Sequence, residues 1–156
     1  MTTTSPPLIE RIKPYHDKAV VSHYLHHVGT SIGNHYELEA VEILNRNINI
    51  EFPTVANWLK TLNDEKVKSA FPAKKKPTFT FIDLFAGIGG FRMALQNLGG
   101  QCIFTSEWDR DAQNTYQNNY GEYPFGVITL PETKAAIPNF DVMCAGFPCQ
   151  TFSKGR

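Results

Sequence analysis

A run of ten residues, Phe81-Ile-Asp-Leu-Phe-Ala-Gly-Ile-Gly-Gly90, constrains the fold of this 156-residue chain more than any other segment. It begins as an apolar strand, ends in a glycine-rich turn and leads directly into a helical pattern. Its glycines permit backbone torsions that are closed to other residues, and they let a ligand approach the main chain. A strand, a glycine turn and a helix in this order usually mark a nucleotide-like ligand at the carboxyl end of a parallel strand.

The segments after residue 78 alternate between strand and helix patterns, which predicts an α/β fold. Such alternation builds βαβ units, with a parallel sheet covered by helices on both faces. We therefore expect an incomplete Rossmann-like sheet over 78–156, with Asp109 as the N-cap of one helix. The expected strands are 79–84, 101–106, 125–128 and 140–145, and the expected helices are 91–98, 109–119 and 131–136.

Residues 1–72 have a helical pattern and form a predicted small α-helical N-terminal region. A linker at 73–77 follows, where three lysines are closed by a proline that interrupts regular structure. One helix is expected to run through 19–27, a second over 36–45 and a third over 54–62. Gly29 and Gly33 are interpreted as the break between the first two. Three short helices can form a helix-turn-helix that reads DNA, although packed domains without a binding role contain them more often.

The composition gives no sign of a strongly basic surface for nucleic acid. The formal net charge is zero, with +2 up to Lys76 and −2 after it, so most phosphate contacts must come from elsewhere. No stretch approaches the roughly 20 apolar residues of a membrane span. The five histidines of the N-terminal region have no zinc-site spacing, and no metal site is expected. Three cysteines without a CxxC pair favour reduced thiols and a cytoplasmic location.

The residues after the second expected strand suit an adenosine. Glu107 lies 20 residues beyond Gly87, the distance at which an acidic residue accepts hydrogen bonds from a ribose. Trp108 follows with a flat apolar face that can stack on adenine. The turn differs from the G-x-G-x-x-G pattern for a pyrophosphate, since its helix begins at once after Gly89 and Gly90. S-adenosylmethionine fits this combination, with its amino-acid end at the glycine turn.

Cys149 is the candidate nucleophile of the chain. The expected strand 140–145 leads into Gly146-Phe-Pro-Cys-Gln-Thr-Phe-Ser153 and so carries this cysteine to the carboxyl edge of the sheet, where ligands bind. Pro148 stiffens the approach. Only a thiolate is a useful nucleophile, and a thiol buried among apolar groups stays protonated. Cys102 and Cys144 lie in apolar strands and are interpreted as core residues.

Around the glycine-rich turn and around Cys149, the sequence resembles the DNA cytosine-5 methyltransferases, especially the bacterial enzymes of restriction–modification systems. The resemblance covers 78–156, about half of the chain. It implies a covalent bond from Cys149 to C6 of a flipped-out cytosine, methyl transfer from S-adenosylmethionine to C5, and double-stranded DNA as partner. It further implies DNA contacts from Gln150 and Ser153. The implied cofactor contacts are Asp83, Phe85, Ala86, Gly87, Gly89, Gly90, Glu107, Trp108, Ile128 and Pro148.

The sequence departs from the family pattern in two ways. Many relatives have Gly-Asp-Ile-Thr where this chain has Gly126-Val-Ile-Thr129, and the side chain of Val127 cannot accept a hydrogen bond from the adenine amino group. This predicts weaker cofactor binding than in a relative with the aspartate. The family's later motifs, including the Glu-Asn-Val that holds the cytosine, are absent after Cys149. We therefore expect the N-terminal fragment of an enzyme, inactive without its missing C-terminal half.

Two other functions stay open at this point. A tRNA cytosine-5 methyltransferase would share these motifs, because one branch of the family acts on RNA. A non-enzymatic regulator would bind DNA through the helical N-terminal region, with the other half vestigial.

Overall fold

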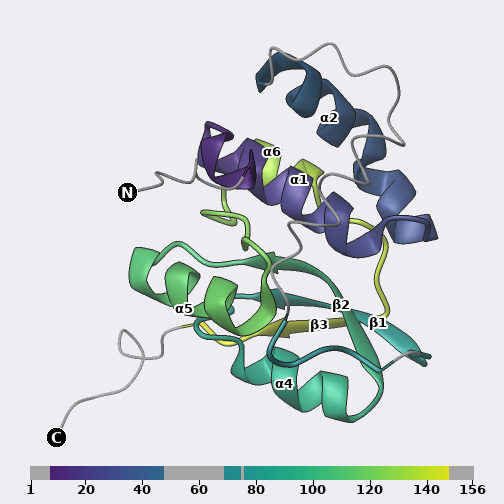
Figure 1. Cartoon of the computed structure of the whole chain (residues 1–156). Helices are drawn as coiled ribbons and strands as arrows, with labels where there is room; N and C mark the ends of the chain where they lie inside the picture. The colour runs from purple at the N-terminus through teal and green to yellow at the C-terminus, as the bar shows by residue number, and fades with distance from the viewer. Residues whose placement is uncertain (1–7, 48–68, 75, 148–156) are drawn as a thin grey trace, which may run out of the picture.

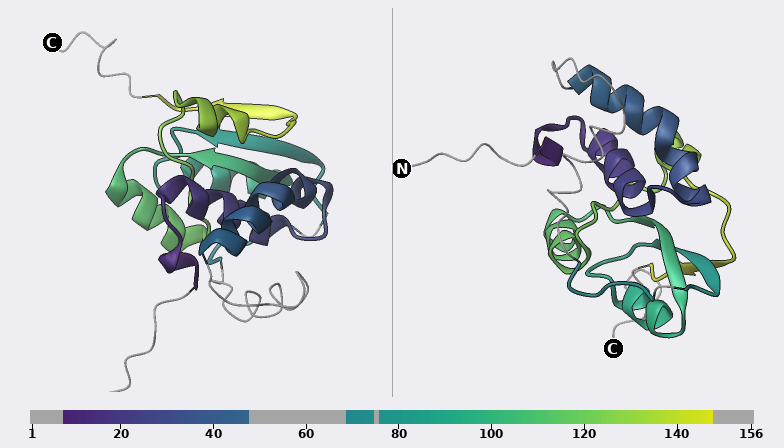
Figure 2. Two further views of the ribbon diagram at one scale, coloured as in Figure 1. Left: turned by 90° about the horizontal axis from the view of Figure 1, so that it is seen from above. Right: turned by 45° about the vertical axis from the view of Figure 1, so that its right-hand side comes forward.

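The computed structural model describes residues 8–47, 69–74 and 76–147. Helices α1 (Tyr15–His27) and α2 (Ser31–Asn47) lie over one face of a three-stranded sheet, and α4 (Gly90–Asn97) lies over the other (Figures 1 and 2). The predicted α/β fold is confirmed. No helix within the described ranges is long and apolar enough to span a membrane.

The sheet is parallel and has the order β2-β1-β3, with β1 at Phe79–Leu84, β2 at Gly100–Ser106 and β3 at Val142–Ala145. The middle of β1 and most of β2 are buried, as their apolar runs predicted. Leu84 is paired with Ser106 on one side and with Ala145 on the other. All three strands therefore end at one edge, which we call the carboxyl edge.

Two further helices follow the strands. The helix α5 (Arg110–Tyr120) begins after Asp109, whose Oδ1 accepts a hydrogen bond of 2.8 Å from Ala112 N, so the predicted N-cap is confirmed. The short helix α6 (Pro131–Ala135) has its proline in the first turn, where the missing N–H costs nothing.

The N-terminal region begins with a 3-10 turn, η1 (Leu8–Arg11), and continues through α1 and α2. The interpretation of Gly33 as a helix break is wrong, since it lies inside the first turn of α2. There Thr30 Oγ1 accepts a hydrogen bond from Gly33 N at 3.2 Å. A Cβ at position 33 would lie only 2.3 Å from His27 O, so glycine allows α2 to approach the end of α1. The expected helix 54–62 lies outside the described residues.

The helices of the N-terminal region and the sheet share one hydrophobic core. Val20 of α1 and Tyr36 of α2 belong to the same buried cluster as Ile82 of β1 and Ile103 of β2. The Tyr36 hydroxyl donates a hydrogen bond of 2.9 Å to Ile103 O. The helices of the N-terminal region are therefore one of the layers that cover the sheet.

Two expected strands differ from the structure. The strand 125–128 is reduced to a single bridge between Phe125 and Ser106, because the chain turns at once, with Leu130 N donating to Val127 O. The strand expected over 140–145 begins only at Val142. Before it, the Asp141 carboxylate accepts hydrogen bonds from the backbone N–H and the hydroxyl of Thr80.

Candidate active site

The glycine-rich turn at the end of β1 has a left-handed backbone at three positions. Phe85 has a φ of 57°, Gly87 of 55° and Gly89 of 93°. A Cβ at position 89 would also lie 2.1 Å from the ring of Tyr120, whose hydroxyl donates to Gly89 O at 2.7 Å. Gly89 is thus required for both torsion and space, and α5 holds the turn in place through Tyr120.

The carboxylate of Glu107 links the turn to the end of β2. Its Oε2 accepts a hydrogen bond of 2.7 Å from Gly87 N. Its Oε1 accepts bonds of 2.8 Å from the backbone N–H groups of Trp108 and Asp109. The carboxylate oxygens retain further lone pairs, and a ribose hydroxyl can donate to these.

Four of the predicted cofactor contacts line one hollow at the carboxyl edge, which we call the donor hollow. They are Phe85, Glu107, Trp108 and Ile128. Glu107 is buried, whereas Trp108 is 68% exposed and presents an open aromatic face. Sequence reasoning missed Ser106 and Thr129 in this lining, because small hydroxyl residues beside a turn carry no distinctive pattern.

The other predicted residues of the turn lie around this hollow. Ala86 is buried against Tyr116 and Tyr120, and its N–H donates to Ser106 O. Gly90 begins α4, and a Cβ there would meet no atom within 4 Å. The turn therefore presents its backbone to the edge, while Ala86 faces the interior.

Asp83 lies directly before the turn and is fully buried. Neither carboxylate oxygen has a hydrogen-bond partner among the described residues. Burial raises the pKa of Asp83 to about 7, against the attraction of the Arg92 guanidinium and of the nearby Arg92 backbone N–H. In this geometry no face of Asp83 is open to a ligand.

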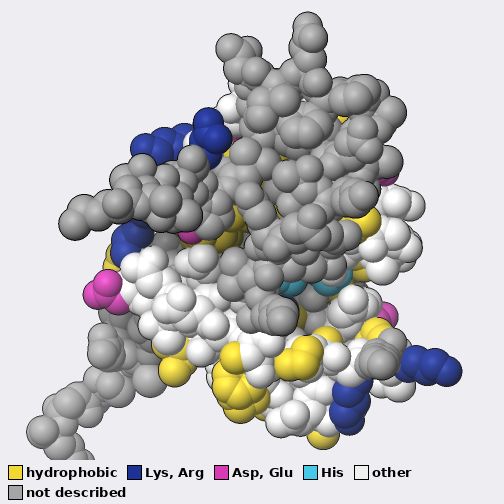
Figure 3. Space-filling view, viewed as in Figure 1, with side chains coloured by type: hydrophobic (Ala, Val, Ile, Leu, Met, Phe, Trp, Pro, Cys, Tyr) yellow, Lys and Arg dark blue, Asp and Glu magenta, His cyan; other side chains and the backbone are white. Residues whose placement is uncertain are grey.

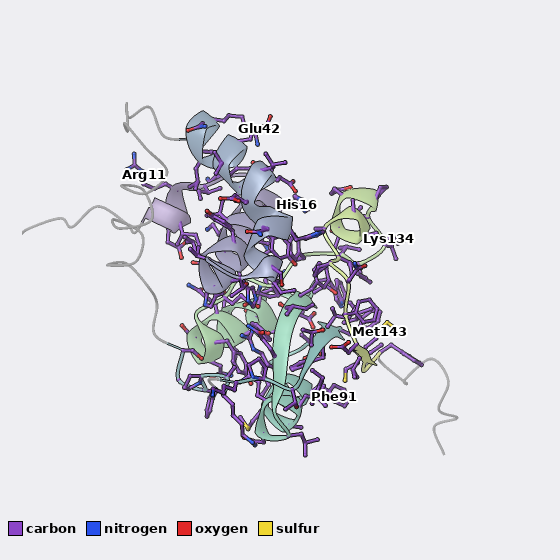
Figure 4. All side chains as sticks on the ribbon, turned by 90° about the vertical axis from the view of Figure 1, so that its right-hand side faces the viewer. Arg11, His16, Glu42, Phe91, Lys134 and Met143 are labelled. Atoms are coloured by element: carbon purple, nitrogen blue, oxygen red, sulfur yellow. The ribbon has the colours of Figure 1, made fainter. Side chains whose placement is uncertain are left out.

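The strand β3 brings the chain to the same edge, because Cys144 is paired with Asp83 and Ala145 with Leu84. The glycine that follows fits closely, since a Cβ at position 146 would lie 2.7 Å from the ring of Phe91. Figure 4 shows Phe91 on the same side of the molecule as Met143 of β3. The predicted Pro148, Cys149, Gln150 and Ser153 lie outside the described residues.

Two cysteines lie within the described residues, and both are free. Cys102 is buried in β2, and burial raises the pKa of its thiol well above the usual range. Cys144 is only half-buried, because β3 is largely exposed, and burial again raises its thiol pKa. Neither environment favours a thiolate at neutral pH. Within the described ranges, no three His, Cys, Asp or Glu side chains are grouped to hold a metal ion.

Residues 79–156 match the family described as C-5 cytosine-specific DNA methylase. This match begins at the first residue of β1 and covers half of the chain. The chain belongs to this family. The matched residues include β1 with its glycine-rich turn, Glu107 and β3, which meet at the carboxyl edge.

Individual relatives agree with this assignment. The chain is 72% identical over 76 residues to the type II methyltransferase M.HpaII of Haemophilus parainfluenzae, which covers 48% of this chain and 21% of the relative. It is 56% identical over 73 residues to M.HhaI of Haemophilus parahaemolyticus, covering 47% and 22%. The identity with M.BsuFI of Bacillus subtilis is 43% over 120 residues, covering 73% and 29%. The chain thus spans between a fifth and a third of the length of these relatives.

The match with the Bacillus subtilis enzyme is longer than the family match and extends into the N-terminal region. This agrees with a shared core, in which the helices of that region are part of the fold.

Proposed function

We propose that this chain is the part of a restriction–modification DNA cytosine-5 methyltransferase that holds the methyl donor and the nucleophile. The observation that carries the proposal is the donor hollow, where Phe85, Glu107, Trp108 and Ile128 meet at the edge to which β3 leads the chain towards Cys149. The family is one of DNA enzymes, which favours DNA over tRNA as substrate. The predicted cytoplasmic location fits this function.

The residues of the donor hollow fit S-adenosylmethionine, which supplies a methyl group bound to a positively charged sulfur. Glu107 would accept hydrogen bonds from the ribose hydroxyls, and Trp108 would stack on the adenine. Phe85 and Ile128 would enclose the adenosine from the other sides, and the backbone at Gly87 and Gly89 would face the amino-acid end. Asp83 is buried and would act only through the turn that follows it.

Cys149 would carry the covalent step on the DNA base. Its thiolate adds to C6 of a cytosine that has left the duplex, and the electron pair moves to C5. C5 then forms a bond to the donor's methyl carbon as the sulfur–carbon bond breaks. A base removes the C5 proton, and the returning electrons break the sulfur–C6 bond to free the thiolate. Gln150 and Ser153 would contact the DNA around the gap.

The remaining catalytic groups would be supplied by the C-terminal half of the enzyme. Within the described residues β3 pairs only with β1, so its outer edge is open. Four large apolar side chains on or next to this strand are exposed, namely those of Phe91, Val142, Met143 and Phe147. Hydrophobic atoms also reach the surface over α4 (Figure 3). Apolar surface next to an open strand suits a continuation of the same fold.

A chimaera tests the proposal. Residues 79–156 would replace the matching segment of M.HpaII, to which this half of the chain is 72% identical. We expect the chimaera to methylate DNA and to form a covalent adduct with DNA containing 5-fluorocytosine, because that base cannot lose its C5 substituent. Cys149→Ser should lower methylation at least about 10³-fold and abolish the adduct, while Cys144→Ser serves as the matched control.

An active Cys149→Ser chimaera, or an adduct that depends on Cys144, would contradict the assigned nucleophile. The 156-residue chain alone should form no adduct, and a trapped complex would show that the C-terminal half is not needed for the covalent step.

A further inference from the structure

A second hollow adjoins the donor hollow, and the two share Trp108, Gly126 and Val127 in their walls. Its other walls include Pro14, Tyr15 and His16 at the start of α1. Figure 4 shows α1, which carries His16, beside α6, which carries Lys134. The N-terminal region therefore reaches the place where the adenine of the donor would end.

Tyr15 is the residue of this wall that is equipped to recognise a ligand. Its hydroxyl oxygen is buried and has no hydrogen-bond partner among the described residues. The ring is held in place by Tyr123, with the centroids 6.4 Å apart and edge to face, and by the Arg110 guanidinium 5.6 Å from the ring centroid. A fixed, buried hydroxyl without a partner is uncommon, because it forfeits its hydrogen bonds to water.

The surroundings of Tyr15 set the protonation state of its hydroxyl. Burial raises the pKa of the phenol, Arg110 opposes the shift, and the carboxylates of Glu10 and Glu107 add to it. The phenol thus keeps its proton at neutral pH and can both donate and accept a hydrogen bond. Tyr15 lines the second hollow together with Trp108 and Val127, the residues that this hollow shares with the donor hollow.

Val127 gives the adenine edge no side-chain partner, since it is an exposed aliphatic residue in the wall common to both hollows. We propose that the Tyr15 hydroxyl takes this place: it accepts a hydrogen bond from the adenine amino group and donates one to the neighbouring ring nitrogen. The inference rests on the proposed function. It makes the N-terminal region part of the donor site and assigns Tyr15 as a residue that selects adenine.

Calorimetry on the 156-residue chain tests this with two ligands, S-adenosylhomocysteine and its analogue with an unsubstituted purine in place of adenine. We expect the wild-type chain to bind the adenine ligand about 5–30 times more tightly, the value of one or two net hydrogen bonds. Tyr15→Phe should bind both ligands equally, at the affinity of the wild type for the purine analogue. Its melting temperature should not fall, because the change removes a hydroxyl that has no partner.

Tyr24→Phe is the matched control, since Tyr24 lies on the same helix and its hydroxyl donates instead to Glu37 at 3.5 Å. This variant should keep the wild-type preference for adenine. If Tyr15→Phe also keeps it, or loses affinity for both ligands alike, the assignment of Tyr15 is overturned while the donor site stands. Glu107→Ala separates the two hypotheses: it should abolish binding, and a wild-type chain that binds neither ligand would overturn the donor site and the role of Tyr15 together.

Discussion

Two buried carboxylates of this chain are held in opposite electrostatic states. Asp83 has no hydrogen-bond partner among the described residues, and burial raises its pKa to about 7. Burial would also raise the pKa of Glu122, but the Arg92 guanidinium at 2.8 Å and the nearby histidines hold it well below its usual range. At neutral pH Glu122 is therefore ionised, whereas Asp83 lies close to its titration midpoint.

The state of Asp83 predicts a pH-dependent effect of Asp83→Asn on stability. With a folded pKa of about 7 against an ordinary value of 3.8, the folded state binds more protons between these values, so stability falls as pH rises through this window. We expect the advantage of the asparagine variant over wild type to be larger at pH 8.5 than at pH 5, by roughly 1–3 kcal/mol. Urea unfolding at the two pH values measures the difference.

Asp141→Asn is the control, because hydrogen bonds from Thr80 lower the pKa of Asp141 and give the opposite sign. Asp141→Asn should therefore give no gain in stability over wild type at high pH. A stability difference between Asp83→Asn and wild type that is the same at both pH values would show that Asp83 is not protonated on folding.

At the scale of elements, one buried network joins helices on both faces of the sheet. Glu122 Oε1 accepts a hydrogen bond of 2.8 Å from Arg92 of α4 and one of 3.3 Å from Thr105 of β2. His23 of α1 has Nε2 3.5 Å from the same oxygen, and this nitrogen accepts a bond from Thr105 N. Burial lowers the pKa of His23, so it is neutral, with its proton on Nδ1, which donates to Ala19 O at 2.9 Å.

This network predicts strong coupling between Arg92 and Glu122. Arg92→Met or Glu122→Leu alone leaves a buried charge without its partner and should cost about 3–5 kcal/mol of unfolding free energy. The double variant should cost much less than the sum, since it buries no unpaired charge. A double-mutant cycle from urea unfolding measures this coupling, and additive losses would mean that the two side chains act independently.

The sequence predicted the elements well wherever local pattern decides them. The strand β1 has the predicted bounds, and β2 and α5 agree within a residue or two at each end, because an apolar run and an Asp N-cap are local signals. The prediction was wrong for Gly33, because the role of this glycine depends on its contact with the end of α1. It was also wrong for the strand 125–128, because the length of a strand depends on the segment it pairs with. The network around Glu122 was missed for the same reason, since its members are far apart in the chain.

At the scale of the whole molecule, the shared core makes the N-terminal region and the sheet one folding unit. Val20 is fully buried in the cluster that contains Ile82 and Ile103. The donor hollow was predictable because its residues belong to contiguous motifs. The contribution of Tyr15 to the second hollow could not be predicted, because α1 comes to lie beside Trp108 only in the folded molecule.

If the molecule is one folding unit, a destabilising substitution in α1 should also shift the unfolding transition measured at the donor hollow. In a Trp58→Phe background, the fluorescence of Trp108 reports unfolding at that site. Val20→Ala should shift this transition by about 2 kcal/mol, whereas Leu38→Ala, 87% exposed on α2, should leave it unchanged. If Val20→Ala leaves the unfolding transition of Trp108 unchanged, the sheet folds independently of α1.

The open edge of β3 has a consequence for how the isolated chain behaves at high concentration. Among the described residues, its outer edge has no strand partner for its backbone N–H and C=O groups, and Val142 and Met143 of the strand are exposed and carry no charge. The four residues of β3 carry no charge that would repel a second copy, and two such edges can join into one continuous sheet. Self-association and precipitation should thus begin at β3, and a lysine introduced at Met143 would act as a gatekeeper that keeps the chain monomeric.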